Sequence, residues 1–370
     1  MASLEDKIAQ SLNFKYYFLM TNTSKLARTI KWLIYASAFI PLVIFSQFLS
    51  PFHFGKIIIF RAIVEIMMVL YILLMWREPF YRPKSNPVLW SFLAFALAFS
   101  FTTAVSVDVY QSFWGTLERM GGLFTFWHYF AFYLVLISVF RTREDWYRFL
   151  RIMVGVGILS ALYGYGQRTN LSFILGSGGR ERIFGTIGNP ALFAGYQIVV
   201  AFLSLTLFMM SDKRRGNDRL LFGGGFIIMA IAVLMTAVRG SILGFGVGLL
   251  LFAYWYMVRS GLVIAKKIFR WLVIAACLFV LFSFGLRNTS VVQNSGYLKR
   301  VTDFSLKSQT VQTRFWAWQA GIKGWIETPK TVLFGWGPDN FNTPPKSNLS
   351  LPRLLSLIMN KVRDKNATTI

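Results

Sequence analysis

The sequence predicts an all-α protein: a polytopic transmembrane helix bundle followed by a C-terminal outer segment of amphipathic helix and loop. Of the 370 residues, 55% are hydrophobic and only 15% are charged, against roughly a quarter charged in soluble domains. The mean hydropathy is +0.52, and long apolar runs recur along the chain. These observations exclude a soluble enzyme, a disordered tail, a collagen-like fibre and a disulfide scaffold. The single cysteine, Cys277, lies in an apolar run.

Nine segments have the length and apolar character of membrane-spanning helices, which need about 20 residues each. The first is expected to be a retained anchor, because no small-residue cleavage site follows it. The segments are Lys31–Leu49, Ile57–Met75, Val88–Ser106, Gly121–Phe140, Phe149–Gly166, Asn189–Met210, Leu220–Val238, Gly240–Val258 and Trp271–Leu286.

The net charge of +24 would suggest a nucleic-acid partner in a soluble protein. When the loops are assigned to alternate sides, twenty basic residues before the end of the ninth segment share the side of the N-terminus, and six lie opposite. The positive-inside rule therefore predicts a cytoplasmic N-terminus and an outer segment after about Arg287. Topology explains most of the charge, so no nucleic-acid partner is expected. It does not explain the few outer basic residues.

Arg61 and Glu65 lie one turn apart in the second segment. Charged residues inside a bilayer usually face a protein interior or an aqueous cavity. An i,i+4 ion pair that only orients helices and a role at a functional site are both open. His128, among aromatic residues of the fourth segment, is expected to be a satisfied core residue, and His53 lies in the first outer loop.

The strongest local signal is the stretch Gly179–Pro190. Asn189 is a favourable N-cap and Pro190 suits the first helical position. The N-terminus of the following helix favours an anion, and Arg180 and Arg182 are able to add bidentate phosphate contacts. An ordinary capped helix after a flexible glycine loop is the alternative.

The seventh and eighth segments are joined by the very short stretch Met235–Ser241, which places Arg239 at the outer mouth. Gly240, Gly244 and Gly248 follow at four-residue spacing, and this small-residue face predicts close helix packing.

Arginines dominate the outer side, which suggests a site for a polyanion at the outer leaflet. Acidic residues are sparse there and no metal-ligand spacing is present, so no metal ion and no cofactor are expected. The five arginines assigned to this side are Arg61, Arg119, Arg180, Arg182 and Arg239.

The sequence becomes polar after the ninth segment. The stretch Arg314–Gly321 predicts an amphipathic helix on the membrane surface, anchored by Trp316, Trp318 and Trp325. A glycine-rich turn follows, up to Phe341. We expect a helical bundle over residues 1–286, an outer loop segment over 287–342 and a divergent polar tail over 343–370.

Six motifs, taken in order and with this topology, resemble the O-antigen ligase and O-antigen polymerase family, although none is specific alone. They are Phe60–Glu65 (FRAIVE), Glu118–Gly122 (ERMGG), Arg182–Pro190 (RIFGTIGNP), Thr236–Ser241 (TAVRGS), Arg314–Trp318 (RFWAW) and Phe334–Phe341 (FGWGPDNF).

The resemblance implies a glycosyltransferase of the bacterial inner membrane that acts in surface polysaccharide (lipopolysaccharide) biosynthesis. Such enzymes transfer a glycan from undecaprenyl pyrophosphate to an acceptor hydroxyl at the periplasmic face, without nucleotide sugar or metal. The implied partners are that lipid-linked glycan, an acceptor glycolipid or glycan, and membrane lipids. The implied catalytic residues are Arg239 and Arg182. Arg119 and Arg314 match the family pattern and are expected to bind pyrophosphate; from the local sequence pattern we expect Arg180, Asn189 and Arg61 to bind it as well.

The chain departs from this pattern near its C-terminus. Family members carry a histidine in the outer loop after the ninth helix and then further helices, whereas this chain has no histidine after His128 and no apolar span after Leu286. The resemblance fades from about Thr343, so a truncated, inactive product is one expectation. A transporter or flippase of lipid-linked oligosaccharide and a non-catalytic assembly protein are the alternatives, and ligase against polymerase is undecided.

Overall fold

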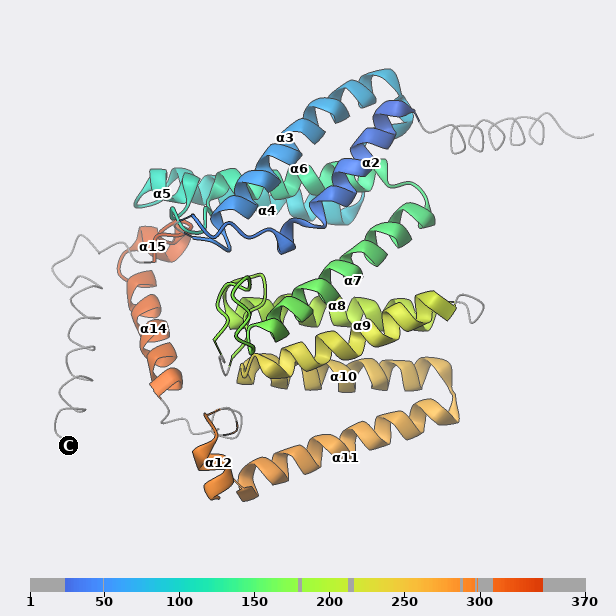
Figure 1. Cartoon of the computed structure of the whole chain (residues 1–370). Helices are drawn as coiled ribbons and strands as arrows, with labels where there is room; N and C mark the ends of the chain where they lie inside the picture. The colour runs from blue at the N-terminus through green and yellow to red at the C-terminus, as the bar shows by residue number, and fades with distance from the viewer. Residues whose placement is uncertain are drawn as a thin grey trace, which may run out of the picture.

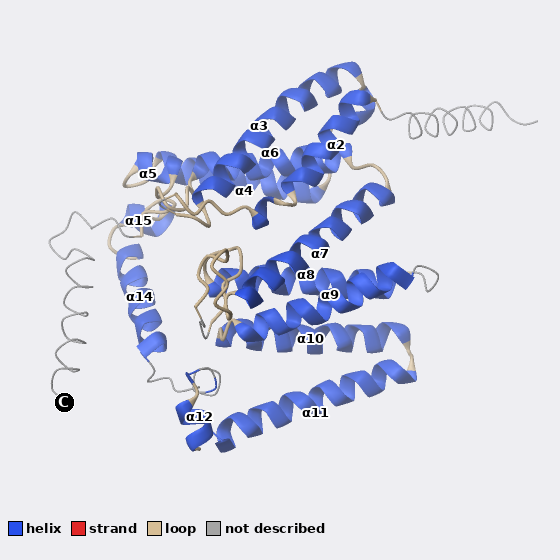
Figure 2. Ribbon diagram, in the orientation of Figure 1, coloured by secondary structure: helices blue, strands red, loops and turns tan. Residues whose placement is uncertain are grey.

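The computed structural model describes residues 24–48, 50–178, 182–211, 216–286, 289–296, 298 and 309–341. Every regular element in these ranges is a helix (Figure 2), which confirms the predicted fold class. The elements are α2 (Lys25–Ser37), η1 (Ile40–Leu42), α3 (Phe54–Arg77), η2 (Pro79–Tyr81), α4 (Pro87–Ala104), α5 (Val109–Trp114), α6 (Leu123–Val139), α7 (Arg143–Gly166), α8 (Pro190–Met210), α9 (Gly216–Met235), α10 (Arg239–Ser260), α11 (Val263–Leu286), α12 (Ser290–Asn294), α14 (Gln309–Trp325) and α15 (Pro329–Phe334).

Several helices have the dimensions of membrane spans, and each of the nine predicted segments overlaps a helix. Six helices within the described ranges, α3, α4 and α7 to α10, are long and apolar enough to cross a bilayer, and α6 is a shorter apolar helix. The protein is therefore a multi-pass membrane protein.

The first predicted segment differs most from the structure. A continuous helix over Lys31–Leu49 was expected, but α2 begins at Lys25 and ends at Ser37, and the 3₁₀ helix η1 follows. Pro41 occupies the start of η1, and proline disfavours the α conformation of the residue before it and supplies no backbone N–H. The apolar residues beyond this point form a loop that leads to α3.

Two clusters of buried side chains hold the bundle together, and α7 links them. Phe149 of α7 belongs to the cluster formed with α2, α3 and α6. Val154, five residues later, belongs to the cluster formed with α8, α9 and α10. Figure 1 shows α7 running between these two groups.

The longer connections, α2–α3, α4–α6 and α7–α8, lie at the end of the bundle where α4, α7 and α9 finish and α6, α8 and α10 begin; we call it the loop end. Figure 1 shows α5, the α7–α8 connection, α14 and α15 there, with α14 running across the ends of the bundle helices. At the opposite end, Lys31 of α2 and Asp145 of α7 form an ion pair at 2.8 Å.

The packing role predicted for the glycine face of α10 is correct for Gly248 only. A Cβ on Gly248 would lie 2.8 Å from the ring of Phe202, whereas a Cβ on Gly240 or Gly244 would meet no atom within 4 Å. The same close approach occurs on α7, where a Cβ on Gly157 would lie 2.8 Å from Val200.

Candidate functional site

A buried amide organises the connection between α7 and α8. Gln167 follows the last residue of α7 and is fully buried. Its Oε1 accepts hydrogen bonds from the backbone N–H groups of Phe184 and Gly185, both at 2.9 Å. Its Nε2 donates to the carbonyls of Gly185 at 3.1 Å and Leu175 at 3.2 Å. One side chain thus satisfies four backbone groups and fixes the loop that carries Arg182.

This loop is held against the short turn between α9 and α10. Arg182 Nε donates to the carbonyl oxygen of Thr236 at 3.0 Å. The N–H of Ile183 donates to the carbonyl of Met235 at 3.4 Å. Arg239 is the first residue of α10, three residues beyond Thr236. The structure therefore brings together the two segments that carry Arg182 and Arg239.

The α2–α3 connection covers the other side of the same loop. A Cβ on Gly188, whose φ is +85°, would lie 2.5 Å from Phe52, and the rings of Phe52 and Phe184 meet edge to face at 5.4 Å. Lys56 Nζ donates to the carbonyl oxygen of Thr186. The α2–α3 connection and the Arg182 loop are therefore in direct contact.

Arg61 holds the loop that carries Arg119. Its side chain is buried, with Nε donating to Thr125 Oγ1 at 3.0 Å and Nη2 donating to the Met120 carbonyl at 3.2 Å. The guanidinium also lies over the ring of Phe124, at 4.8 Å from its centroid. Arg119 itself is exposed in this loop. Through these contacts Arg61 holds the turn at Met120, directly after Arg119, against α6.

Of the two open interpretations of the Arg61–Glu65 pattern, the ion pair along α3 is not what the structure shows, and a role at a functional site stays a prediction. Instead of pairing with each other along α3, the two side chains contact α6 and the turn before it. Glu65 Oε1 lies 3.1 Å from Nε2 of His128. The other ring nitrogen of His128 lies 2.7 Å from the carbonyl of Phe124. Both ring nitrogens of His128 have partners, as expected of a satisfied core histidine.

The pKa of His53, directly before α3, depends on burial and on charged residues of two connections. Burial lowers the pKa of its imidazole, and the ammonium of Lys56 lowers it further; Glu118 raises it and Arg119 lowers it. The first outer loop and the Arg119 loop are therefore electrostatic neighbours. A cavity of about 270 Å³ lies between them, lined by Gln47, Phe48, Ser50, Phe54, Leu117 and Glu118.

Asn189 caps α8 as predicted, with Pro190 at the first helical position. Its Oδ1 accepts from the N–H groups of Ala191 at 2.8 Å and Leu192 at 3.4 Å. The side chain thus uses two of the amides that an anion would need, and an anion-binding role of Asn189 stays a prediction. Arg180 lies outside the described residues.

The C-terminal segment that follows α15 docks on the loop that connects α4 with α5 and on α5 itself. Asn340 is fully buried, and its Nδ2 donates to Ser112 Oγ at 2.8 Å. Asp339 Oδ2 accepts from the N–H of Thr116 at 2.6 Å, and the N–H of Val107 donates to the Trp336 carbonyl at 3.0 Å. The predicted glycine-rich turn is therefore a docking element that joins the end of the described chain to the first half of the bundle.

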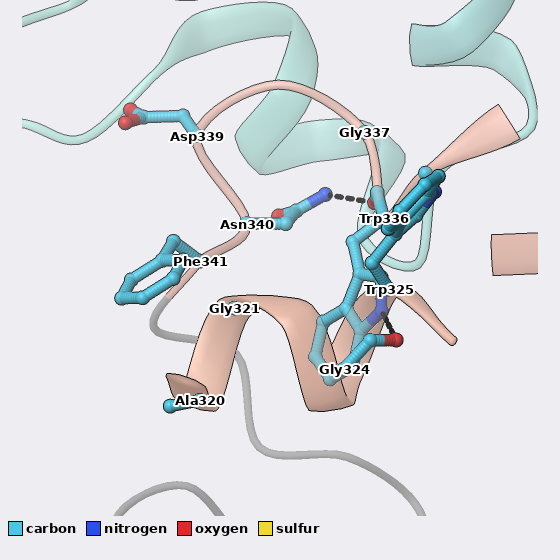
Figure 3. A pocket seen from close by; sticks show the side chains of 10 residues that line it. Ala320, Gly321, Gly324, Trp325, Trp336, Gly337, Asp339, Asn340 and Phe341 are labelled. Carbon is cyan, nitrogen blue, oxygen red and sulfur yellow. Dashed lines mark hydrogen bonds between the residues drawn. The ribbon is translucent and has the colours of Figure 1, made fainter. Parts of the chain in front are cut away.

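A second cavity of about 260 Å³ lies between this turn and the face of α14 that carries Gly321 and Gly324 (Figure 3). The indole N–H of Trp336 donates to the carbonyl of Gly324 at 2.8 Å and closes one side of it. Arg314 is exposed on α14, and the expected interfacial anchors Trp318 and Trp325 are 64% and 52% exposed. Trp316 is partly buried.

A comparison with known protein families adds an independent observation. Residues 224–357 match the model of the O-antigen ligase family. This part of the chain is therefore similar to the O-antigen ligase family. The matched range includes Arg239 and Arg314 and crosses the expected boundaries after residues 286 and 342. No match was found among curated proteins or among solved structures.

Two residues that organise the loops of this candidate site were not identified from the sequence. Lys56 is one of the six basic residues on the side opposite the N-terminus, but no motif assigns it a role. Gln167 belongs to none of the motifs. Their partners, Thr186 for Lys56 and the amides of Phe184 and Gly185 for Gln167, are distant in sequence, so no local motif identifies either residue.

Proposed function

We propose that this protein is a member of the O-antigen ligase family and transfers a glycan from undecaprenyl pyrophosphate to an acceptor hydroxyl at the periplasmic face of the bacterial inner membrane. The observation that carries the proposal is the hydrogen bond from Arg182 Nε to the carbonyl of Thr236 at 3.0 Å. It unites the arginine of the α7–α8 loop with the turn that presents Arg239, at the end of the bundle where the loops gather.

The proposed reaction requires stabilisation of a growing negative charge. The bond between the sugar's anomeric carbon and the pyrophosphate oxygen breaks, and its electron pair leaves with the pyrophosphate. The acceptor oxygen forms a bond to the same carbon, and its proton passes to a base. Guanidinium groups are suited to the leaving pyrophosphate because they stay charged and bind phosphate oxygens bidentately. We assign this role to Arg182 and Arg239, and assign pyrophosphate binding to Arg119, Arg180, Asn189 and Arg314.

The contacts of Arg61 change the role that we propose for it. Its Nε and Nη2 donate to Thr125 and to the Met120 carbonyl, so it is a positioning residue for the Arg119 loop. This proposal predicts that loss of Arg61 weakens donor binding through the neighbouring loop. A direct contact of Arg61 with pyrophosphate is not needed.

The orientation follows from the positive-inside rule and is part of the proposal. A cytoplasmic N-terminus places the loop end, with Arg182 and Arg239, in the periplasm. Reporter fusions after α9 and after α10 test it: a periplasmic signal after α9 and a cytoplasmic signal after α10 are expected. The reverse pattern contradicts the proposal.

The decisive assay uses purified protein in lipid nanodiscs, a labelled glycan on undecaprenyl pyrophosphate, and a set of acceptors. We expect transfer by the wild type and at least about a 10²-fold loss in Arg239→Ala, the order of magnitude for removing one charge-stabilising contact. Arg259→Ala, at the other end of the same helix α10, is the matched control and should retain activity. Movement of the donor across the bilayer without transfer supports a flippase. The absence of both transfer and movement supports an assembly role.

A further inference from the structure

Lys56 contacts the loop that carries Arg182 and has no acidic partner within the described part of the chain. It is the third residue of α3 and partly buried, and its Nζ donates to the backbone carbonyl of Thr186. An ammonium carries three N–H donors. No carboxylate forms an ion pair with Lys56 among the residues that the structure describes. Glu118, in the loop that carries Arg119, is exposed, and its charge raises the pKa of His53.

The position of Lys56 links the segments that carry the candidate arginines. Its partner Thr186 lies four residues after Arg182, in the loop that contacts the turn before Arg239. On the other side, Phe54, two residues before Lys56, lines a cavity together with Leu117 and Glu118, which directly precede Arg119. Lys56 therefore lies between the Arg119 loop and the Arg182 loop.

The surroundings of Thr186 make this position rigid. Thr186 is 2% exposed, and its hydroxyl lies 2.7 Å from Ser160 Oγ in a fully buried contact. Phe52 packs on the same loop at Gly188. A charge held in a rigid, partly desolvated place interacts with an opposite charge more strongly than a solvated surface lysine does. Because the described protein supplies no counter-charge, a bound anion is the natural partner.

We propose that Lys56 is a further phosphate-binding residue of this site and contacts the pyrophosphate of the lipid-linked donor with its remaining N–H donors. This inference rests on the proposed function, because it names a residue of the same donor site. It assigns to the first outer loop a direct part in donor binding, in addition to its packing on the Arg182 loop.

A purely structural role would have a different signature. If Lys56 only tethers Thr186, then any loss of activity should follow opening of the loop. If its charge binds the donor, then removal of the charge should weaken donor binding while the loop stays closed. Lys56→Arg keeps the charge and the donors, Lys56→Gln keeps an N–H donor without charge, and Lys56→Met keeps only the apolar stem.

The test measures two quantities for each variant in nanodiscs: the Kd for undecaprenyl pyrophosphate and the hydrogen exchange of the 182–189 amides. We expect a Kd about ten- to a hundredfold higher in Lys56→Gln and Lys56→Met, the effect of losing one charged hydrogen bond, and near wild-type affinity in Lys56→Arg. The exchange of the loop should remain within about threefold of wild type in Lys56→Gln. Lys266→Gln, an exposed lysine of α11 at the opposite end, should leave both quantities unchanged.

Wild-type affinity in Lys56→Gln and Lys56→Met overturns the inference. An affinity loss that tracks loop opening across the variants also overturns it and makes Lys56 a tether. Because the binding assay needs no glycan transfer, a protein that binds the lipid pyrophosphate through Lys56 but transfers nothing leaves this inference intact and refutes the proposed function.

Discussion

Replacing Gln167 by leucine should open the α7–α8 loop. Gln167 is fully buried, and its Oε1 is the acceptor for the amides of Phe184 and Gly185, at 2.9 Å each. Leucine has a similar volume but no acceptor, so it leaves two N–H groups without this partner. Each unsatisfied buried donor costs about 1–3 kcal/mol. The closed loop should therefore lose about 2–6 kcal/mol relative to opened states in which water satisfies these groups.

Hydrogen exchange of the peptide that contains residues 182–189 measures this loss directly. A change of about 2 kcal/mol in the opening free energy corresponds to about a 30-fold faster exchange. We expect at least this acceleration for the amides of Phe184 and Gly185 in Gln167→Leu, together with loss of glycan transfer, because the same loop carries Arg182.

Gln197 of α8 offers a matched control. It is also fully buried, but it makes a single hydrogen bond, from Nε2 to the carbonyl of Gly157 at 3.2 Å, and its Oε1 has no protein partner. Gln197→Leu removes this unsatisfied oxygen and should change exchange of the 182–189 peptide less than about threefold. Equal exchange in the two variants, or wild-type exchange in Gln167→Leu, would refute the organising role of Gln167.

Two further substitutions test other contacts of the fold. Gly337→Ala should undock the outer turn, because φ at this position is +89° and a Cβ would lie 2.1 Å from that of Ser106; faster exchange of the Val107 amide is the readout. Asp145→Asn should lower the unfolding free energy by about 1–3 kcal/mol in thermal unfolding experiments. The variant leaves the ammonium of Lys31, 2.8 Å away and 15% exposed, without its counter-charge.

Each of these two substitutions has a control in the same region. Gly121→Ala adds a Cβ that meets no atom within 4 Å and should leave exchange at Val107 unchanged. Glu144→Gln breaks a solvent-exposed pair with Arg148 and should leave the unfolding free energy nearly unchanged, because water screens such a pair. If a control changes its readout as much as the corresponding test variant does, the contact that the test variant breaks does not have the role assigned to it.

The sequence was sufficient wherever the signal is local. Apolar runs of membrane-spanning length predicted the helices, and the Asn189–Pro190 pair predicted the start of α8 because capping depends on adjacent residues. The short link before Arg239 likewise required a tight turn. The end of the first helix at Ser37 was predictable as well, since Pro41 marks it, but a hydropathy window does not register a missing N–H.

The sequence was insufficient where partners are distant along the chain. The contact of Lys56 with Thr186 spans 130 residues, and the contact of Arg61 with Thr125 spans 64. Spacing along α3 placed Arg61 and Glu65 on one face but could not show that both side chains reach toward α6 and its preceding turn. Such pairs depend on which helices become neighbours, and this is decided by packing across the whole bundle.

The central claim is that arginines at the loop end bind a lipid pyrophosphate through its charge. Equilibrium binding of undecaprenyl pyrophosphate and of uncharged undecaprenol to the nanodisc protein tests it most directly. We expect the wild type to prefer the pyrophosphate, less strongly at high salt, and Arg182→Gln and Arg239→Gln each to weaken its binding about tenfold or more. Equal binding of the two lipids by the wild type, or unchanged pyrophosphate affinity in both variants, would contradict the claim.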